Sequence, residues 1–345
     1  MKAAAPMKDA TALARALADP ISALEMGEDG WTQLLSMART ERLDGSLAYR
    51  LADLPIPEPV RRAFEDARRE AEFGHSQALW EIEMVRRTLS AEGLPLILLK
   101  GSAFAYAGLP AAIGRHVGDL DILLPRDALP VAEAALLDAG FEWVKTDDYS
   151  QAYYRQWMHE LPPLLHKDRG SSVDVHHSIL PLTARRTPDA EALIATSIEL
   201  QPGIRILAPA DMIVHAATHL LADGDLAGGL RNLWDIDRLL RLFSANRDFW
   251  PELGRRATLH QMREPVALAT RLASAIFATP VEPRIAGHDR MRDALFVRRL
   301  LARDGWGRAT RPVNRLGFYI RSHMMRMPPH MLTRHLWIKF NTRQN

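Results

Sequence analysis

The segment from Leu94 to Leu180 changes its hydrophobic period several times, and this constrains the fold more than any other feature. The continuous apolar runs "LPLILLK" and "DLDILL" are typical of buried strands. Helical-period stretches, "AFAYAG" and "RDALPVAEAALLDAG", lie after each of them, and "FEWVK" is a further strand. The runs "LPPLLHK" and "SSVDVHHSIL" flank the turn-forming cluster "DRGS", which predicts a β-hairpin. Strands and helices that alternate over so short a distance predict a small mixed α/β sheet.

Helical periodicity surrounds this segment on both sides. Residues 57–93 predict one long helix that begins at prolines and ends at Gly93. The helical period returns at Pro209, with "PADMIVHAATHLLADG" and "LRNLWDIDRLLRLFS" as the best cases. We therefore expect an α/β (α+β) fold with three parts. They are an N-terminal helical segment (1–93), an α/β core (94–205) and a C-terminal helical region with a basic tail (206–345).

The composition excludes several classes of protein. The 345 residues include no cysteine, which rules out disulfides, thiolate zinc sites and cysteine nucleophiles. Charged residues interrupt the N-terminus, so it does not read as a signal peptide. No apolar run approaches the roughly 20 residues of a membrane-spanning helix. We expect a cytoplasmic protein, with peripheral membrane contact as an option.

Positive charge is concentrated at the C-terminal end. Residues 290–345 contain 13 Lys and Arg against two acids, a local charge of +11, although the whole chain carries only +2. Three interpretations stay open. The tail is a solvated helical surface, it contacts an anionic membrane surface or a partner helix, or it binds a polyanion such as RNA.

Three aspartates are the strongest candidates for chemistry. Asp119 and Asp121 occupy alternate positions of a predicted strand, so their side chains should lie on one face. Asp174 lies in a second strand and shares its facing with His176. Carboxylates together with substrate phosphates are the ligands that Mg²⁺ prefers. Two such ions about 4 Å apart can activate a hydroxyl and stabilise leaving pyrophosphate.

A phosphate-binding element is predicted upstream of these acids. Lys100-Gly101-Ser102 lies at a strand-to-helix junction, where glycine permits close backbone approach and free N–H groups favour an anion. The alternatives are a solvated strand end for the paired acids and a hairpin cap for Asp174. His176 either orients Asp174 or an acceptor, or is a packed core residue, and His177 faces the other way as a structural residue.

Two further motifs favour structural roles. His215 and His219 have the i, i+4 spacing of zinc-binding helices, but Ala216 stands where the general-base Glu of such sites would be. We expect buried histidines beside the core. Asp235 and Asp237 lie about 200° apart on a helix, so they cannot bind one metal together.

The run "LILLKGSAFAYAG…GRHVGDLDILLP", followed by "SVDVHH" and "PADMIVHAATHLL…LRNLWDIDRLL", resembles the uncharacterised nucleotidyltransferase family of the DNA polymerase β superfamily. That family's pattern is a Lys-Gly turn, an Arg, a D-[IL]-D strand, a "D-[VL]-H" strand and a helical C-terminal half. The match covers about Leu94 to Leu240, with weaker similarity before it.

The resemblance implies a minimal nucleotidyltransferase fold that uses an NTP such as ATP with Mg²⁺ or Mn²⁺. By position, Gly101 and Ser102 would hold the triphosphate, and Asp119 and Asp121 the metal ions. Asp174 would complete the catalytic metal site and orient the acceptor hydroxyl or accept its proton.

Three further residues are expected near the metal and the triphosphate. Arg115 and Lys100 fit the variant family's pattern, with a phosphate contact expected for Arg115 and a weaker one for Lys100, and His176 would lie beside the cofactor. Sixteen residues separate Ser102 from Asp119, a longer gap than in the best-known polymerase β-like enzymes.

The leading hypothesis is transfer of a nucleoside monophosphate to a small molecule, a glycan intermediate or a protein side chain. One alternative is transfer to an RNA or tRNA 3′ end, as in toxin-like relatives, guided by the basic residues 290–345. The other is a non-catalytic nucleotide-binding scaffold. RNA binding would weaken steeply with salt, and a scaffold would bind NTP without releasing pyrophosphate.

Overall fold

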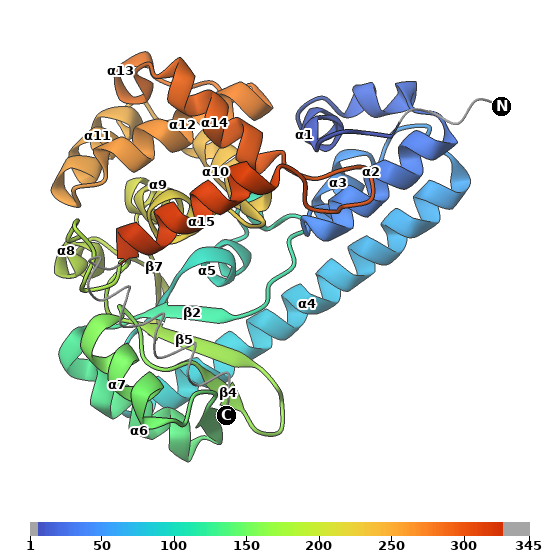
Figure 1. Ribbon diagram of the computed structural model, residues 1–345. Helices are drawn as coiled ribbons and strands as arrows, with labels where there is room; N and C mark the ends of the chain where they lie inside the picture. The colour runs from blue at the N-terminus through green and yellow to red at the C-terminus, as the bar shows by residue number, and fades with distance from the viewer. Residues whose placement is uncertain (1–5, 327–345) are drawn as a thin grey trace.

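The computed structural model describes residues 6–326, which form a seven-stranded mixed sheet with helices on both sides (Figure 1). The strand order is β3-β4-β5-β2-β1-β7-β6. The predicted α/β class is therefore confirmed. The strands are β1 (Leu96–Leu98), β2 (Leu120–Leu123), β3 (Phe141–Trp143), β4 (Leu164–His166), β5 (Ser172–His176), β6 (Ile198–Gln201) and β7 (Ile204–Ile206).

The centre of the sheet explains the continuous apolar runs. Strand β2 pairs antiparallel with β1 and parallel with β5, and every residue of β1 and β2 is buried. Strands covered on both faces are apolar throughout rather than alternating. The predicted hairpin is β4–β5, which pairs antiparallel. A second hairpin, β6–β7, was not predicted, because all four residues of β6 are exposed and it lacks an apolar run.

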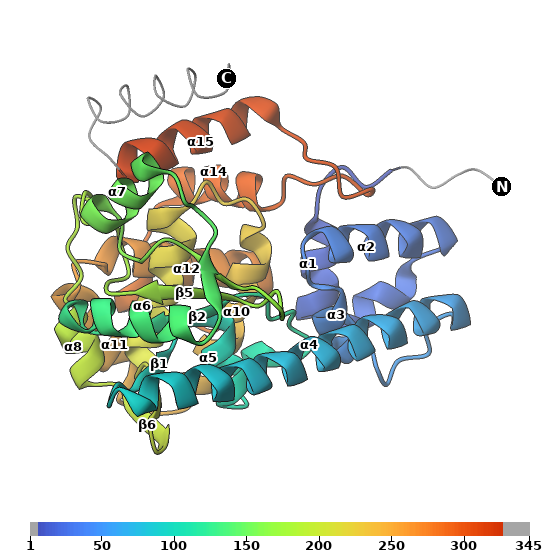
Figure 2. The ribbon, with the colours of Figure 1, turned by 90° about the horizontal axis from the view of Figure 1, so that it is seen from below.

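Helices α4 and α6 cover one side of the sheet (Figure 2). The long helix predicted for residues 57–93 is α4 (Glu58–Ala91), whose 34 residues span about 51 Å. Its buried stripe includes Phe64, Ile82 and Val85. The other helices on the N-terminal side and around the core are α1 (Thr11–Ala18), η1 (Pro20–Glu25), α2 (Glu28–Thr40), α3 (Asp44–Arg50), α5 (Lys100–Tyr106), η2 (Pro110–Ala112), η3 (Arg126–Ala128), α6 (Leu129–Asp138) and α7 (Asp148–Trp157).

The N-terminal helices contact the loop that leads into β2. Gly45 of α3 lies so close to Gly114 that a Cβ on Gly45 would fall 2.3 Å from the Gly114 carbonyl oxygen. The hydroxyl of Ser46 donates to the carbonyl of Ile113 at 3.0 Å. These two contacts fix the position of the start of β2, and with it Asp119, relative to α3.

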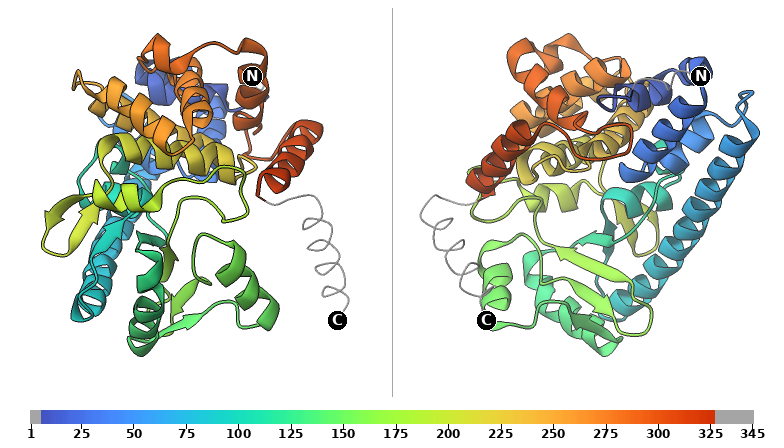
Figure 3. Two further views of the ribbon diagram at one scale, coloured as in Figure 1. Left: turned by 90° about the vertical axis from the view of Figure 1, so that its left-hand side faces the viewer. Right: turned by 45° about the vertical axis from the view of Figure 1, so that its right-hand side comes forward.

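The C-terminal helices pack on the opposite side of the sheet (Figure 3). They join the strands and the N-terminal helices in one connected apolar core. Within residues 6–326, none of the helices combines the length and apolar character needed to cross a membrane. The elements are α8 (Ala190–Ala195), α9 (Pro209–Thr218), the π-helical η4 (His219–Asp223), α10 (Gly229–Phe243), α11 (Phe249–Leu259), α12 (Arg263–Phe277), α13 (Pro283–Ala286), α14 (Arg290–Leu300) and α15 (Pro312–Arg326).

Helices α14 and α15 contain the first part of the predicted basic tail, and residues 327–345 lie outside the described residues. The division of the chain at residues 93 and 205 remains a prediction.

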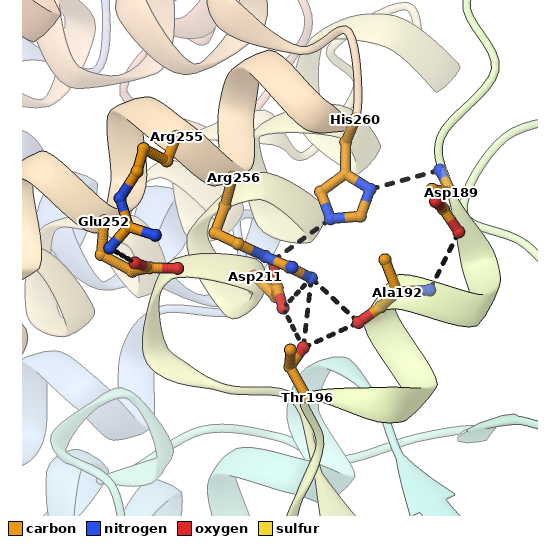
Figure 4. A network of polar contacts seen from close by, with 8 residues as sticks. All are labelled: Asp189, Ala192, Thr196, Asp211, Glu252, Arg255, Arg256 and His260. Atoms are coloured by element: carbon orange, nitrogen blue, oxygen red, sulfur yellow. Dashed lines mark hydrogen bonds and ion pairs between the residues drawn. The ribbon is translucent and has the colours of Figure 1, made fainter.

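A buried polar network fixes α9 against α8 and α11 (Figure 4). The carboxylate of Asp211, which is fully buried, accepts two hydrogen bonds from Arg256, at 2.6 and 2.7 Å, and one from Thr196 at 2.8 Å. Burial opposes the charge, but hydrogen bonds from His260, Arg256 and Thr196 hold the pKa of Asp211 below its ordinary value. The network therefore fixes the helix whose next turns lie beside the acid-bearing strands.

Candidate active site

The strand-to-helix junction predicted at Lys100-Gly101-Ser102 is present, with α5 beginning at Lys100 itself. The backbone N–H of Leu99 donates to the carbonyl of Asp121 at 2.9 Å, so this turn lies directly beside β2. Lys100 has a φ of 47°, a left-handed conformation that costs a non-glycine residue about 1–3 kcal/mol. The hydroxyl of Ser102 is buried and donates to the Leu99 carbonyl at 2.7 Å.

Two of the predicted acids are neighbours across the sheet. The parallel pairing of β2 with β5 sets Asp121 opposite Asp174 and Leu123 opposite His176. Because paired residues point to one face, the two carboxylates lie side by side. Asp119 directly precedes β2 and is exposed. Its charge contributes to the raised pKa of Asp174, so the structure brings all three acids into one electrostatic neighbourhood.

Lys100 and His176 both contact the carboxylate of Asp121. The Lys100 ammonium lies 2.6 Å from Oδ1 of Asp121, and Nε2 of His176 lies 3.0 Å from the same oxygen. Although burial alone would raise it, Lys100 and then His176 hold the pKa of Asp121 well below its ordinary range. Asp121 in turn raises the pKa of Lys100 against the effect of burial. Lys100 is therefore the lysine that forms an ion pair with Asp121.

Asp174 is the acid of this site whose pKa is raised. Burial first, then repulsion from Asp121 and Glu160, raises the pKa of Asp174 to about 7. Two carboxylates held this close repel unless a cation lies between them. A divalent ion with oxygen ligands would remove that repulsion, and carboxylate oxygens are ligands that Mg²⁺ prefers. Among the residues that the structure describes, the three aspartates do not form a group whose carboxylate oxygens all lie within 4.8 Å of one another. An ion shared by Asp119, Asp121 and Asp174 therefore stays a prediction.

Arg115 is held by another acid, across the molecule. Its Nε lies 3.1 Å from Oδ2 of Asp235 on α10, and both side chains are buried. The guanidinium packs directly on Gly101, because a Cβ built there would lie 1.7 Å from Nη1 of Arg115. Position 101 thus needs a glycine because the Arg115 guanidinium approaches its backbone closely. A phosphate that approached this turn would need a glycine for the same reason. Contact of Arg115 with a phosphate stays a prediction.

Two cavities adjoin this centre. One, of about 330 Å³, is lined by Ser102, Asp119, Gln77, Trp80 and the turn Arg169–Ser172. The other holds only about 40 Å³ and is lined by side chains that include Lys100, Arg115 and His215. Of the predicted site residues, Ser102 and Asp119 line the larger cavity, whereas Lys100 and Arg115 line the smaller one.

Two residues beside the acids were missed from the sequence. Among the residues that the structure describes, the group of His, Asp and Glu side chains close enough to share one metal ion is His159, Glu160 and His176. His159 and Glu160 follow α7 and precede β4, outside any predicted strand. The letters "HE" carry no spacing signal, and only the pairing with β5 reveals them.

The other histidines and aspartates have structural surroundings. Burial, together with the Lys100 charge, lowers the pKa of His215 well below its ordinary value. Nε2 of His177 contacts the Met158 carbonyl at 3.2 Å, away from the acids. Asp235 pairs with Arg115, whereas Asp237 binds Arg241 and Thr279, so the two aspartates of α10 take separate partners.

The sheet with neighbouring acids on β2 and β5, and a Lys-Gly turn beside them, defines the class of nucleotidyltransferase-like α/β proteins. Residues 27–278 match the family described as an uncharacterised nucleotidyltransferase. The match covers more than half of the chain, so the protein belongs to this family. No curated protein matches the chain closely enough to be compared with it.

Proposed function

We propose that the protein transfers a nucleoside monophosphate from an NTP to an acceptor hydroxyl, using Mg²⁺ and releasing pyrophosphate. The observation that carries the proposal is the pairing of Asp121 with Asp174 on adjacent parallel strands. The turn Lys100-Gly101-Ser102 lies beside them, because Leu99 bonds to the backbone of Asp121. Membership of the nucleotidyltransferase family supports the reaction class. ATP is the first NTP to test.

The three aspartates have different surroundings, so we assign them different roles. Asp121, kept ionised by its neighbours, and Asp119, exposed at the cavity, would hold Mg²⁺ together with Asp174. When bound, Mg²⁺ supplies charge neutralisation at the phosphates and the leaving pyrophosphate. Asp174, which lies opposite Asp121 on the adjacent strand, would orient the acceptor hydroxyl or accept its proton.

The reaction balances with these groups alone. The acceptor oxygen forms a bond to the α-phosphorus, the bond to the bridging α–β oxygen breaks, and pyrophosphate leaves. The acceptor proton passes to Oδ of Asp174 and from there to solvent. Ser102 lines the cavity beside the triphosphate, and the indole of Trp80, which is 51% exposed, offers a surface for stacking of the base.

The test is transfer of label from each α-labelled NTP, with Mg²⁺ and fractionated cell lysate as the source of acceptor. Asp121→Asn and Asp174→Asn should each reduce transfer by at least about 100-fold. Asp127→Asn is the matched control, since Asp127 is exposed a few residues beyond β2. Transfer that survives both active-site variants would contradict the proposal.

One feature favours an anionic acceptor, such as an RNA 3′ end. A groove of about 420 Å³ beyond β5 is lined by four arginines, Arg185, Arg186, Arg292 and Arg321, with Glu264 as its acid. Nη1 of Arg321 is buried and has no hydrogen-bond partner. RNA held there should lose affinity steeply between 50 and 200 mM salt, and Arg321→Gln should reduce the salt dependence. A salt-independent KM for the labelled acceptor would favour a small neutral molecule.

A further inference from the structure

The chain segment after α7 runs beside the end of β5. The backbone N–H of Leu161 donates to the Val175 carbonyl at 2.9 Å, and that of His177 donates to the His159 carbonyl at 2.8 Å. This pairing sets Glu160 directly opposite His176 in an antiparallel bridge. Directly opposed residues point to the same face, so the carboxylate and the imidazole lie together.

The three side chains converge on one point. Oε2 of Glu160 lies 3.4 Å from Nδ1 of His176 and 3.9 Å from Nε2 of His159. The ligand atoms all lie within 4.8 Å of one another. Ligands about 2.0–2.2 Å from a tetrahedral zinc ion stand roughly 3.3–3.5 Å apart. A small inward movement of His159 would therefore complete such a site.

His159 presents Nε2 to Glu160. The residue is 7% exposed, and its other ring nitrogen, Nδ1, has no hydrogen-bond partner. The nitrogen that faces Glu160 is therefore the one that would bind an ion, which it does in the neutral form of the ring.

His176 has the second partner that metal-binding histidines generally have. Its Nδ1 faces Glu160, while its Nε2 lies 3.0 Å from Oδ1 of Asp121. If Nδ1 binds an ion, Nε2 carries the proton and donates it to the carboxylate. This carboxylate–histidine–metal arrangement fixes the ring tautomer and orientation.

We propose that His159, Glu160 and His176 bind a zinc ion through Nε2, Oε2 and Nδ1. Two imidazoles and one carboxylate suit zinc, with a fourth position for water. The neighbouring aspartates offer oxygen alone, which suits Mg²⁺. The zinc site fixes His176 and, through it, the carboxylate of Asp121. It concerns metal binding only, so it stands independently of nucleotide transfer.

The test uses the full-length protein after treatment with a chelator. Zn²⁺ is titrated against a chromophoric competitor, with excess Mg²⁺ present to occupy carboxylate sites. The wild-type protein should bind one Zn²⁺ tightly. His159→Gln and Glu160→Gln should each weaken that binding by at least about 10-fold, by analogy with the loss on removing outer-shell partners. Co²⁺ in place of Zn²⁺ should give the visible absorption of a tetrahedral site, which both variants lose.

His177→Gln is the matched control, because that histidine is the next residue along and contacts the Met158 carbonyl instead. It should keep the wild-type affinity for Zn²⁺. Circular dichroism of each metal-free variant shows whether it is folded, and Glu160→Gln, which keeps the size of the side chain, is the safer of the two. Absence of stoichiometric Zn²⁺ binding by the wild type, or wild-type affinity in both folded variants, would overturn the proposal.

Discussion

Replacing Gly101 by alanine tests whether the Lys-Gly turn is built around Arg115. The new Cβ would lie 1.7 Å from Nη1 and 2.4 Å from Cζ of the Arg115 guanidinium, so that side chain must leave its position. Its partner Asp235 is 4% exposed and would keep only its longer contact with Arg231, at 3.5 Å. Breaking a buried ion pair costs about 3–5 kcal/mol, whereas alanine in place of glycine within a helix gains about 0.5–1 kcal/mol. We expect the free energy of unfolding to fall by about 2–4 kcal/mol.

The measurement is a double-mutant cycle by urea unfolding, with Gly101→Ala made in the wild type and in Arg115→Ala. In the second background the space is free, so Gly101→Ala should be neutral or slightly stabilising. Gly74→Ala is the control, since Gly74 also lies in a helix and its nearest neighbour would be 4.0 Å from the new Cβ. Equal destabilisation by Gly101→Ala in both backgrounds would refute the reasoning.

Three other changes have definite expected results. The pKa of Asp174 is raised to about 7, so the folded chain keeps a proton that the unfolded chain loses near pH 4. Without metal, its contribution is complete below pH 4, and the free energy of unfolding should then fall up to about pH 7, by at most about 1.4 kcal/mol per pH unit; Asp174→Asn should flatten this profile, and an unchanged profile would contradict it. Arg256→Met removes the arginine that pairs with the buried Asp211, which keeps only its contacts with Thr196 and His260. It should cost about 3–5 kcal/mol in chemical unfolding, whereas the exposed neighbour Arg255→Met should change stability by less than about 0.5 kcal/mol. Trp80→Ala should raise KM for the NTP by roughly 10-fold with little change in kcat, and an unchanged KM would exclude stacking on Trp80.

Features with a local physical cause could be predicted from the sequence. The period of two in "DLDILL" correctly indicates that Asp121 lies on a strand, and the apolar run around it gives the burial of that strand. Prolines before Glu58 and Gly93 after Ala91 mark the ends of α4 closely. The turn cluster "DRGS" gives the β4–β5 hairpin. Each of these depends on residues only a few positions apart.

The remaining features depend on contacts between distant residues. Arg115 and Asp235 are 120 positions apart, and nothing in either segment indicates their pairing. Lys100 contacts Asp121 because Leu99 bonds to the backbone of β2, which requires the register of β1 with β2. Glu160 lies in a short irregular segment without an apolar period, so only its bridge to His176 places it beside the acids.

The charge balance of the site links these distant contacts to its chemistry. Lys100 pairs with Asp121, while burial, followed by repulsion from Asp121 and Glu160, raises the pKa of Asp174 to about 7. Both causes disfavour a negative charge on Asp174 beside Asp121, and a divalent cation between the carboxylates would offset them. Such an ion would compete with Lys100 for Oδ1 of Asp121. The Lys100 side chain lines the small cavity together with Arg115 and His215 and does not line the larger one. A displaced ammonium would therefore have to move before it could contact a triphosphate in the larger cavity.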